Sequence, residues 1–140
     1  MTVKRPYRDL IERLKEKGLR PTRQRLALAK LLFDPEDRHL TAEQLHAEAV
    51  GAGVRVSLAT VYNSLHQFTE AGLLREVVVE AGRSYFDTNV EDHHHFYYEE
   101  SGCLQDIPGS QLSLHRLPDA PEGTRISRVD VTIRLSKTNS

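Results

Sequence analysis

The hydrophobic pattern changes its period once along the chain, and this change sets the strongest limit on the fold. Up to Gly72, apolar residues recur at helical spacing, whereas Leu74–Glu80 and Arg83–Asp87 show the alternation typical of β-strands. The turn Ala81-Gly82 joins the two alternating stretches, so they are predicted to form a β-hairpin directly after a helical segment. Helices in tight succession followed by a hairpin predict a winged helix.

Four short helices are predicted before the hairpin, because start and stop signals recur there. Thr22 and Ser57 stand where N-caps are expected, and Thr41-Ala42-Glu43-Gln44 is a capping box. Gly18 and Gly72 are placed to end the first and the fourth helix. The fourth helix is expected to bury an apolar stripe of Leu58, Val61, Leu65 and Phe68.

A second, smaller domain is predicted after a polar connection at residues 88–92. Strands are expected at His93–Tyr98, at residues 103–107 and, most strongly, at Arg125–Leu135, while Leu112–Leu117 is ambiguous. The predicted class is therefore α+β. A winged helix-turn-helix domain occupies residues 1–88, and a small α/β domain occupies residues 89–140.

Charge is distributed unevenly, although the net charge is only −1. Residues 1–30 hold ten basic and three acidic side chains, whereas residues 91–140 hold five basic and eight acidic ones. A basic first segment fits a polyanion-binding module, but on charge alone a solvated helix face is the favoured interpretation.

Cysteine content and hydropathy exclude several classes of protein. A lone cysteine, Cys103, allows neither an intramolecular disulfide nor a Cys₄ zinc site, and we expect it to be a small buried hydrophobe. The first ten residues have no apolar signal region, and no run approaches the roughly 20 apolar residues of a membrane span. We therefore expect a cytoplasmic protein with no membrane partner.

The fourth predicted helix carries side chains suited to a DNA groove on the face opposite its apolar stripe. No acidic residue lies between Ser57 and Thr69, so nothing in this stretch repels phosphates. Asn63 can pair with a base edge, while Tyr62 and Thr60 can bond to phosphate or contact a thymine methyl group. Basic and amide side chains at the start of the second helix would contact the DNA backbone and so position the protein on the duplex. The predicted DNA contacts are Arg20, Arg23, Gln24, Arg25, Ser57, Ala59, Thr60, Tyr62, Asn63 and His66.

The run Asp92-His93-His94-His95 is the densest group of ligand-type side chains in the chain. Side chains alternate along a strand, so His93 and His95 would share one face, and Asp92 and His94 would share the other. Two imidazoles at this spacing can chelate one divalent metal, and haem iron also accepts a histidine. A solvated histidine run is the alternative reading.

Several motifs together resemble the ferric uptake regulator (Fur) family. They are Gly18-Leu19-Arg20-Pro21-Thr22-Arg23-Gln24-Arg25, His39-Leu40-Thr41-Ala42-Glu43-Gln44-Leu45, Ser57-Leu58-Ala59-Thr60-Val61-Tyr62-Asn63-Ser64-Leu65 and Gly72-Leu73. The resemblance covers roughly residues 10–108. It implies a homodimer that binds operator DNA as a transcription regulator, with a C-terminal dimerisation domain and metal ligands at the hinge.

The resemblance also implies a ligand set. His39, Asp87, His93 and His95 fall where the family places its regulatory metal ligands, and Asp106 matches a carboxylate used by peroxide-sensing members. An Fe²⁺, Mn²⁺ or Zn²⁺ ion held there would fix the angle between the domains and so control DNA affinity.

Departures from the family pattern point to one branch. Tyr98 and Ser101 stand where a Cys-x-x-Cys pair is usual, so no structural Cys₄ zinc site carries over, and Asn63 replaces a usual arginine. The resemblance also implies that the family's long helix after the second strand is shortened here to Gly109–Leu117. The chain thus most resembles the iron response regulator (Irr) branch, which is associated with haem sensing. Without an N-terminal Cys-Pro motif, any haem would have to use His93, His94 and His95.

Four hypotheses remain at this point. The first is an Irr-like repressor that responds to iron or haem, and the second is a peroxide sensor that uses Fe²⁺ or Mn²⁺ at the same site. The third, a metal-dependent hydrolase, lacks an evident nucleophile and an open coordination position. The fourth is a metal buffer without operator affinity. A second metal site at Asp92, His94 and His115 is a further alternative, although a solvated His115 is expected.

Overall fold

The contacts within the chain divide it into two compact units, Met1–Val90 and Glu91–Ser140. The structure is a computed structural model that describes residues 6–33, 36–80 and 82–138. Within these ranges, no helix has the length and apolarity to cross a membrane.

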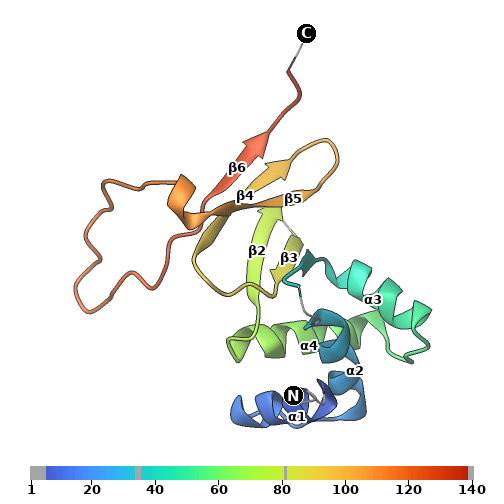
Figure 1. The fold of residues 1–140 in the computed structure, drawn as a ribbon. Coiled ribbons are helices and arrows are strands. Elements are labelled where there is room, and N and C mark those ends of the chain that lie inside the picture. The colour runs from blue at the N-terminus through green and yellow to red at the C-terminus, as the bar shows by residue number, and fades with distance from the viewer. Residues whose placement is uncertain (1–5, 34–35, 81, 139–140) are drawn as a thin grey trace, which may run out of the picture. The chain divides into compact units, whose positions relative to one another are not determined.

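The first unit has helices in tight succession followed by a hairpin, as the pattern predicts (Figure 1). This winged helix confirms the predicted α+β class. Its described elements are α1 (Pro6–Glu16), α2 (Arg23–Leu32), β1 (His39–Leu40), α3 (Ala42–Gly51), α4 (Leu58–Glu70), β2 (Arg75–Glu80) and β3 (Arg83–Asp87).

Side-chain caps fix the starts of three helices at the predicted positions. The Thr41 hydroxyl accepts the Gln44 backbone N–H at 3.1 Å, and the Gln44 side chain accepts the Thr41 N–H at 2.9 Å. Thr22 and Ser57 cap α2 and α4 in the same way, through one accepted N–H each. The reciprocal bonds at α3 satisfy two donors that a helix start otherwise leaves unpaired.

Gly72 ends α4 because the chain must turn with a positive φ there. Its φ of 81° lies in the left-handed region, which costs glycine no steric strain. The Gly72 N–H bonds to the Thr69 carbonyl at 3.0 Å, and the Leu73 N–H reaches back to the Phe68 carbonyl at 2.9 Å. This closure sends the chain directly into β2.

The wing is a three-stranded sheet in the order β1-β3-β2, with all neighbours antiparallel. The hairpin β2–β3 was predicted, and of its turn residues Ala81 lies outside the described part. The short strand β1 was not predicted. It pairs with β3 so that His39 lies opposite Asp87, and Leu40 lies opposite Phe86.

One apolar cluster holds the first unit together. Side chains from all four helices enter it, and Val61, Leu65 and Phe68 of α4 are fully buried. The expectation for Leu58 was wrong, because it is 37% exposed. Leu58 is the first residue of α4 and lies beyond the reach of the core at that end.

The second unit is a three-stranded sheet in the order β5-β4-β6. β5 pairs antiparallel with β4, and β6 pairs parallel with it. Its elements are β4 (His93–Tyr98), β5 (Leu104–Pro108), the 3₁₀ turn η1 (Gly109–Gln111) and β6 (Thr132–Leu135).

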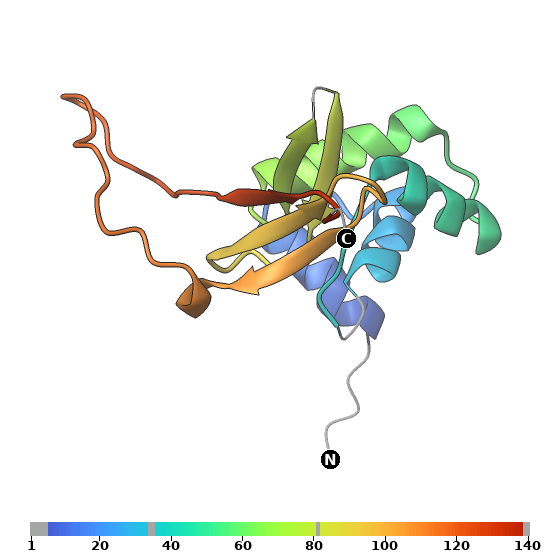
Figure 2. The ribbon, with the colours of Figure 1, turned by 90° about the horizontal axis from the view of Figure 1, so that it is seen from above.

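Three expectations for this unit were wrong. The strand expected at Arg125–Leu135 begins only at Thr132, next to the His95 N–H bond to the Val131 carbonyl, because residues 125–130 pair with no strand of the described chain. Residues 112–131 instead form a long irregular connection (Figure 2). Helical structure after β5 is limited to η1, and Cys103 is exposed because it lies in the turn between β4 and β5.

Candidate metal centre and DNA-facing surface

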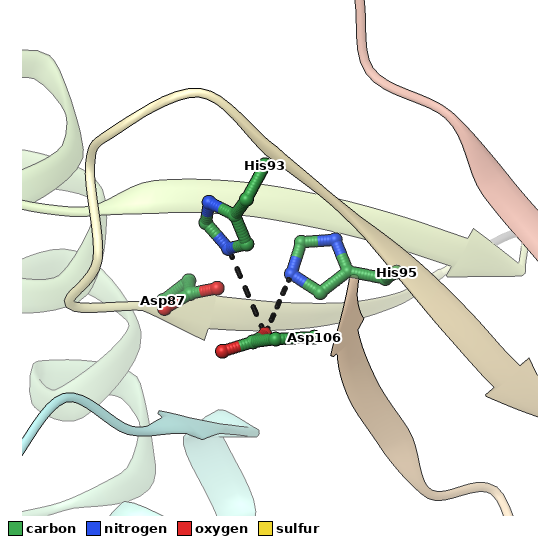
Figure 3. A group of neighbouring side chains, drawn as sticks. All are labelled: Asp87, His93, His95 and Asp106. Carbon is green, nitrogen blue, oxygen red and sulfur yellow. Dashed lines mark ion pairs between the residues drawn. The ribbon is translucent and has the colours of Figure 1, made fainter. Parts of the chain in front are cut away.

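Two histidines of β4 and one aspartate of β5 converge in the second unit. His93 and His95 lie on the same face of the strand, with ring centroids 4.5 Å apart. Asp106 is the register partner of His95 on β5. Figure 3 shows both imidazoles directed at the Asp106 carboxylate, whose Oδ1 lies 3.7 Å from His93 Nε2 and 3.3 Å from His95 Nε2.

These separations fit a shared metal ion. Ligand atoms of the three side chains all lie within 4.8 Å of one another. Around an ion with bonds of about 2.1 Å, two tetrahedral ligands lie about 3.4 Å apart, close to both measured distances. Imidazole nitrogen and carboxylate oxygen together suit divalent first-row metals.

The tautomer of His93 supports the same reading. Its Nδ1 lies 2.6 Å from the Glu91 carbonyl oxygen, which can only accept a hydrogen bond. Nδ1 therefore carries a proton, so in the neutral ring the lone pair is on Nε2, the nitrogen directed at Asp106. Histidine ligands of metals typically donate their other N–H to a carbonyl in this way.

Burial separates this cluster from a solvated histidine run. His93, His94 and His95 are 5%, 8% and 4% exposed, whereas Asp106 is open to solvent. Buried polar rings need partners, so the alternative of a freely solvated run does not hold.

His94 points to the opposite face and has a different partner. Its Nδ1 accepts the backbone N–H of Val131 at 3.1 Å, just before β6. The neutral ring must then carry its proton on Nε2, so neither nitrogen has a free lone pair while this bond persists. Asp92 and His115 are both exposed, and among the described residues no metal-type group forms around them.

His39 and Asp87 belong to the first unit and lie opposite each other on β1 and β3. Asp87, which Figure 3 also labels, is fully buried, and its Oδ1 accepts the Asn89 N–H at 2.9 Å. The His39 ring packs edge-on against Tyr85, with centroids 5.9 Å apart. Two of the predicted ligands are thus adjacent within the wing.

The predicted DNA-facing side chains of α4 lie largely at the surface. Ala59, Asn63 and His66 are exposed, whereas Thr60 and Tyr62 are half-buried. The rings of Tyr62 and His66 stack at a centroid distance of 6.5 Å. The exposed Ser57 acts as the cap of the helix, so its hydroxyl oxygen already has a bond to the Thr60 N–H.

At the start of α2 and just before it, some of the predicted DNA contacts are exposed, whereas others form hydrogen bonds within the protein. Arg20 and Arg23 are exposed, and the Gln24 side chain donates to the Arg55 carbonyl at 3.2 Å. The Arg25 guanidinium donates to Gln67 Oε1 on α4 at 2.8 and 3.2 Å, and also to the Arg20 carbonyl at 2.9 Å. Arg25 therefore joins α2 to α4.

Sequence reasoning missed one residue on this surface, Glu43. The Tyr62 hydroxyl donates to Glu43 Oε1 at 2.6 Å. This bond lowers the pKa of Glu43, with a smaller contribution from the charge of Arg83, and it raises the pKa of Tyr62. Nineteen residues separate the two partners, so no local pattern could have indicated the contact.

The fold and the cluster together define a class: winged-helix proteins with a metal-type histidine and carboxylate group in a second unit. Residues 16–134 match the sequence profile of the Ferric uptake regulator family. The chain belongs to this family. Its members are regulators of transcription rather than enzymes, so the hydrolase hypothesis is not supported.

Known relatives agree with this assignment. The ferric uptake regulation protein of Vibrio anguillarum is 37% identical over 86 residues, which cover 61% of this chain and 58% of that relative's length. The ferric uptake regulator of Vibrio cholerae has a TM-score of 0.73 at 23% identity, covering 92% of this chain and 100% of that one. The Pseudomonas aeruginosa regulator, solved with manganese, has a TM-score of 0.71 at 23% identity, covering 91% and 97%. At these identities, the two structures show the fold alone.

Proposed function

We propose that the protein is a metal-responsive, dimeric transcription regulator that binds operator DNA through α4. The convergence of His93, His95 and Asp106, with the His93 Nδ1 proton held by a carbonyl, is the observation that carries the proposal. The family membership and the cap-initiated α4, which has no acidic residue before Glu70, support the DNA-binding part. The ligand class is a divalent first-row metal: Fe²⁺, Mn²⁺ or Zn²⁺.

The site is proposed to draw further ligands from the first unit. Asp87 and His39 are register partners on the wing, and Asp87 precedes the histidine run by only a short connection. An ion that takes ligands from both units would restrict their relative rotation. In a dimer, this restriction would favour one separation of the two α4 helices, and so one DNA affinity.

Homodimerisation is supported by the composition of the second unit. It buries few apolar side chains, mainly Tyr97, Leu104 and Ile107, while Leu114, Leu117 and Ile126 are exposed. A unit of about 50 residues is marginal on its own, and association with a second copy would cover apolar surface.

The side chains favour an ion over haem as the ligand. The Nε2 atoms of His93 and His95 both face the Asp106 carboxylate, an arrangement that suits a small cation. His94 would have to release the Val131 amide before it could bind iron. The Irr-like response to haem remains a prediction, tested by a haemin titration in which a saturable, histidine-type Soret band is the supporting result.

Peroxide sensing through bound Fe²⁺ also remains a prediction. It requires oxidation of a ligand histidine, which mass spectrometry would detect as a gain of one oxygen atom on His39 or His93 after peroxide treatment. An unmodified ligand set after peroxide treatment of the Fe²⁺-loaded protein contradicts it.

The experiment that tests the proposed function compares His93→Ala with His115→Ala in the full chain. Both variants remove an imidazole from the second unit, but His115 is exposed and outside the cluster. Metal stoichiometry is measured by calorimetry with Mn²⁺, Zn²⁺ and anaerobic Fe²⁺. Affinity for a duplex selected from a random pool is then measured with and without metal.

We expect the wild type and His115→Ala to bind metal at this site and to change their DNA affinity on loading. His93→Ala should lose this site and the response. Equal metal binding and an equal DNA response in His93→Ala and His115→Ala would overturn the site assignment. Metal binding without any sequence preference on DNA would favour a metal buffer.

A further inference from the structure

The hydroxyl of Tyr62 is held by a carboxylate at the middle of the DNA-facing helix. Tyr62 lies on α4, and its oxygen is 2.6 Å from Glu43 Oε1 on α3. Glu43 is in the first turn of α3, where the Thr41–Gln44 capping box fixes the backbone. Both residues belong to the first unit, so their geometry does not depend on the second.

This bond decides what Tyr62 can offer to a ligand. A phenol has one proton, and a carboxylate can only accept. While the Tyr62 proton is directed at Glu43, the phenol oxygen presents only lone pairs to an approaching group. The Glu43 charge also disfavours a phosphate at this point, because phosphate oxygens need a donor and carry negative charge.

The pair lines a hollow beside the first residues of β3. Its volume is about 360 Å³, and its walls include Thr41, Gly82, Arg83 and Ser84 besides Glu43 and Tyr62. Arg83 is exposed and lies close enough to Glu43 to lower the pKa of that carboxyl. The hollow therefore combines an acceptor side, at Tyr62 and Glu43, with a cation on the wing.

Bases differ in what they present in the major groove. Adenine and cytosine present amino groups, which donate, whereas guanine O6 and thymine O4 accept. An acceptor-only tyrosine matches an amino group and mismatches a carbonyl. A tyrosine free to turn its hydroxyl could bond to either.

We infer that Glu43 is a specificity-determining residue that acts through Tyr62: it keeps the hydroxyl an acceptor, so that one position of each half-site favours adenine or cytosine. Glu43 is thus a positioning residue, and Tyr62 is the group that meets the base. The inference rests on the proposed DNA-binding function and deepens it.

The test uses the full, Mn²⁺-loaded protein and a duplex that the wild type selects from a random pool. Each position of the duplex is then replaced by all four base pairs, and relative affinities are measured for the wild type, Glu43→Ala and Tyr62→Phe. Glu70→Ala is the matched control, because it removes a carboxylate from the far end of the same helix, about 12 Å along its axis from Tyr62.

We expect Glu43→Ala and Tyr62→Phe each to weaken the preference for adenine or cytosine at one shared position by roughly five- to tenfold. Preferences at the other positions should be retained, which also shows that the variants fold. Glu70→Ala should keep the full pattern. A uniform loss of affinity, or losses at two different positions, would overturn the inference.

A second measurement checks the contact without DNA. With tyrosines labelled at Cζ, carbon NMR should show the pKa of Tyr62 above its ordinary value in the wild type and returned toward that value in Glu43→Ala. Identical titrations would show that the bond does not form. This result would overturn the inference about Glu43 and leave the DNA-binding proposal standing. Absence of any sequence preference in the wild type would overturn both the DNA-binding proposal and the inference.

Discussion

The two units of this protein are built from different interiors. The first encloses a continuous apolar cluster supplied by all four helices, with Leu28, Leu65 and Phe68 fully buried. In the second, three of the buried side chains are histidines, and among its described residues the buried apolar side chains are Tyr97, Leu104 and Ile107. The first unit is therefore held mainly by hydrophobic burial, whereas the second relies more on hydrogen bonds, since every buried side-chain polar atom of the described residues has a partner.

The largest effect is expected from the core of the first unit. Phe68→Ala removes a fully buried ring that also packs edge-on against Phe33 at 6.1 Å. Replacing such a ring costs about 3–5 kcal/mol, including the cavity left behind. Chemical denaturation should show this loss in the free energy of unfolding of the first unit, and a loss below about 1 kcal/mol would contradict a core held mainly by burial.

Metal loading should give the next largest effect, centred on the strands that carry the proposed ligands rather than on the helical core of the first unit. Ligand binding to the folded state alone stabilises it by about 2.7 kcal/mol when free metal is a hundred times the dissociation constant. Hydrogen exchange should show slower opening of β4 and β5 with Mn²⁺ than with a chelator. Protection that rises equally in α1 and α2 would mean that metal binding stabilises both interiors to the same extent, which contradicts the comparison.

Loss of the α3 cap is expected to be smaller. Thr41→Ala removes the hydroxyl that accepts the Gln44 N–H, which costs about 1 kcal/mol at a helix start. The same variant should destabilise the first unit in thermal melts without changing metal stoichiometry. Thr41→Ser keeps the acceptor and serves as the control.

The smallest effect is expected in the connection of the second unit. Leu117 is 48% exposed within one copy of the chain, so Leu117→Ser should change stability by less than about 0.5 kcal/mol in a monomer. A larger loss that depends on protein concentration would show that a second copy covers this segment. Analytical ultracentrifugation of the variant beside the wild type distinguishes the two outcomes.

The sequence predicted the first unit well because its signals are local. The caps at Thr22, Thr41 and Ser57 and the stop at Gly72 act within a few residues, so they could be recognised one at a time. Leu58 was misplaced because periodicity gives the face of a helix but not how far the core extends along it.

Errors concentrate where structure depends on distant partners. Residues 125–130 alternate like a strand but pair with no strand of the described chain, and the two-residue β1 exists only because β3 lies beside it. The site shows the same division. Alternation predicted that His93 and His95 share a face, whereas the engagement of His94 with Val131 and of Tyr62 with Glu43 joins residues far apart in the sequence.

The connection between β5 and β6 has a consequence for how the chain can be cut. It runs from one edge of the sheet to the other and exposes Arg116, Arg125 and Arg128, each a site for trypsin. Cleavage there would leave β6 as a separate peptide, held by its parallel pairing with β4 and by the bond from the Val131 amide to His94. The second unit would then be a noncovalent assembly of two fragments, and the C-terminal strand could be exchanged for a synthetic one carrying a label.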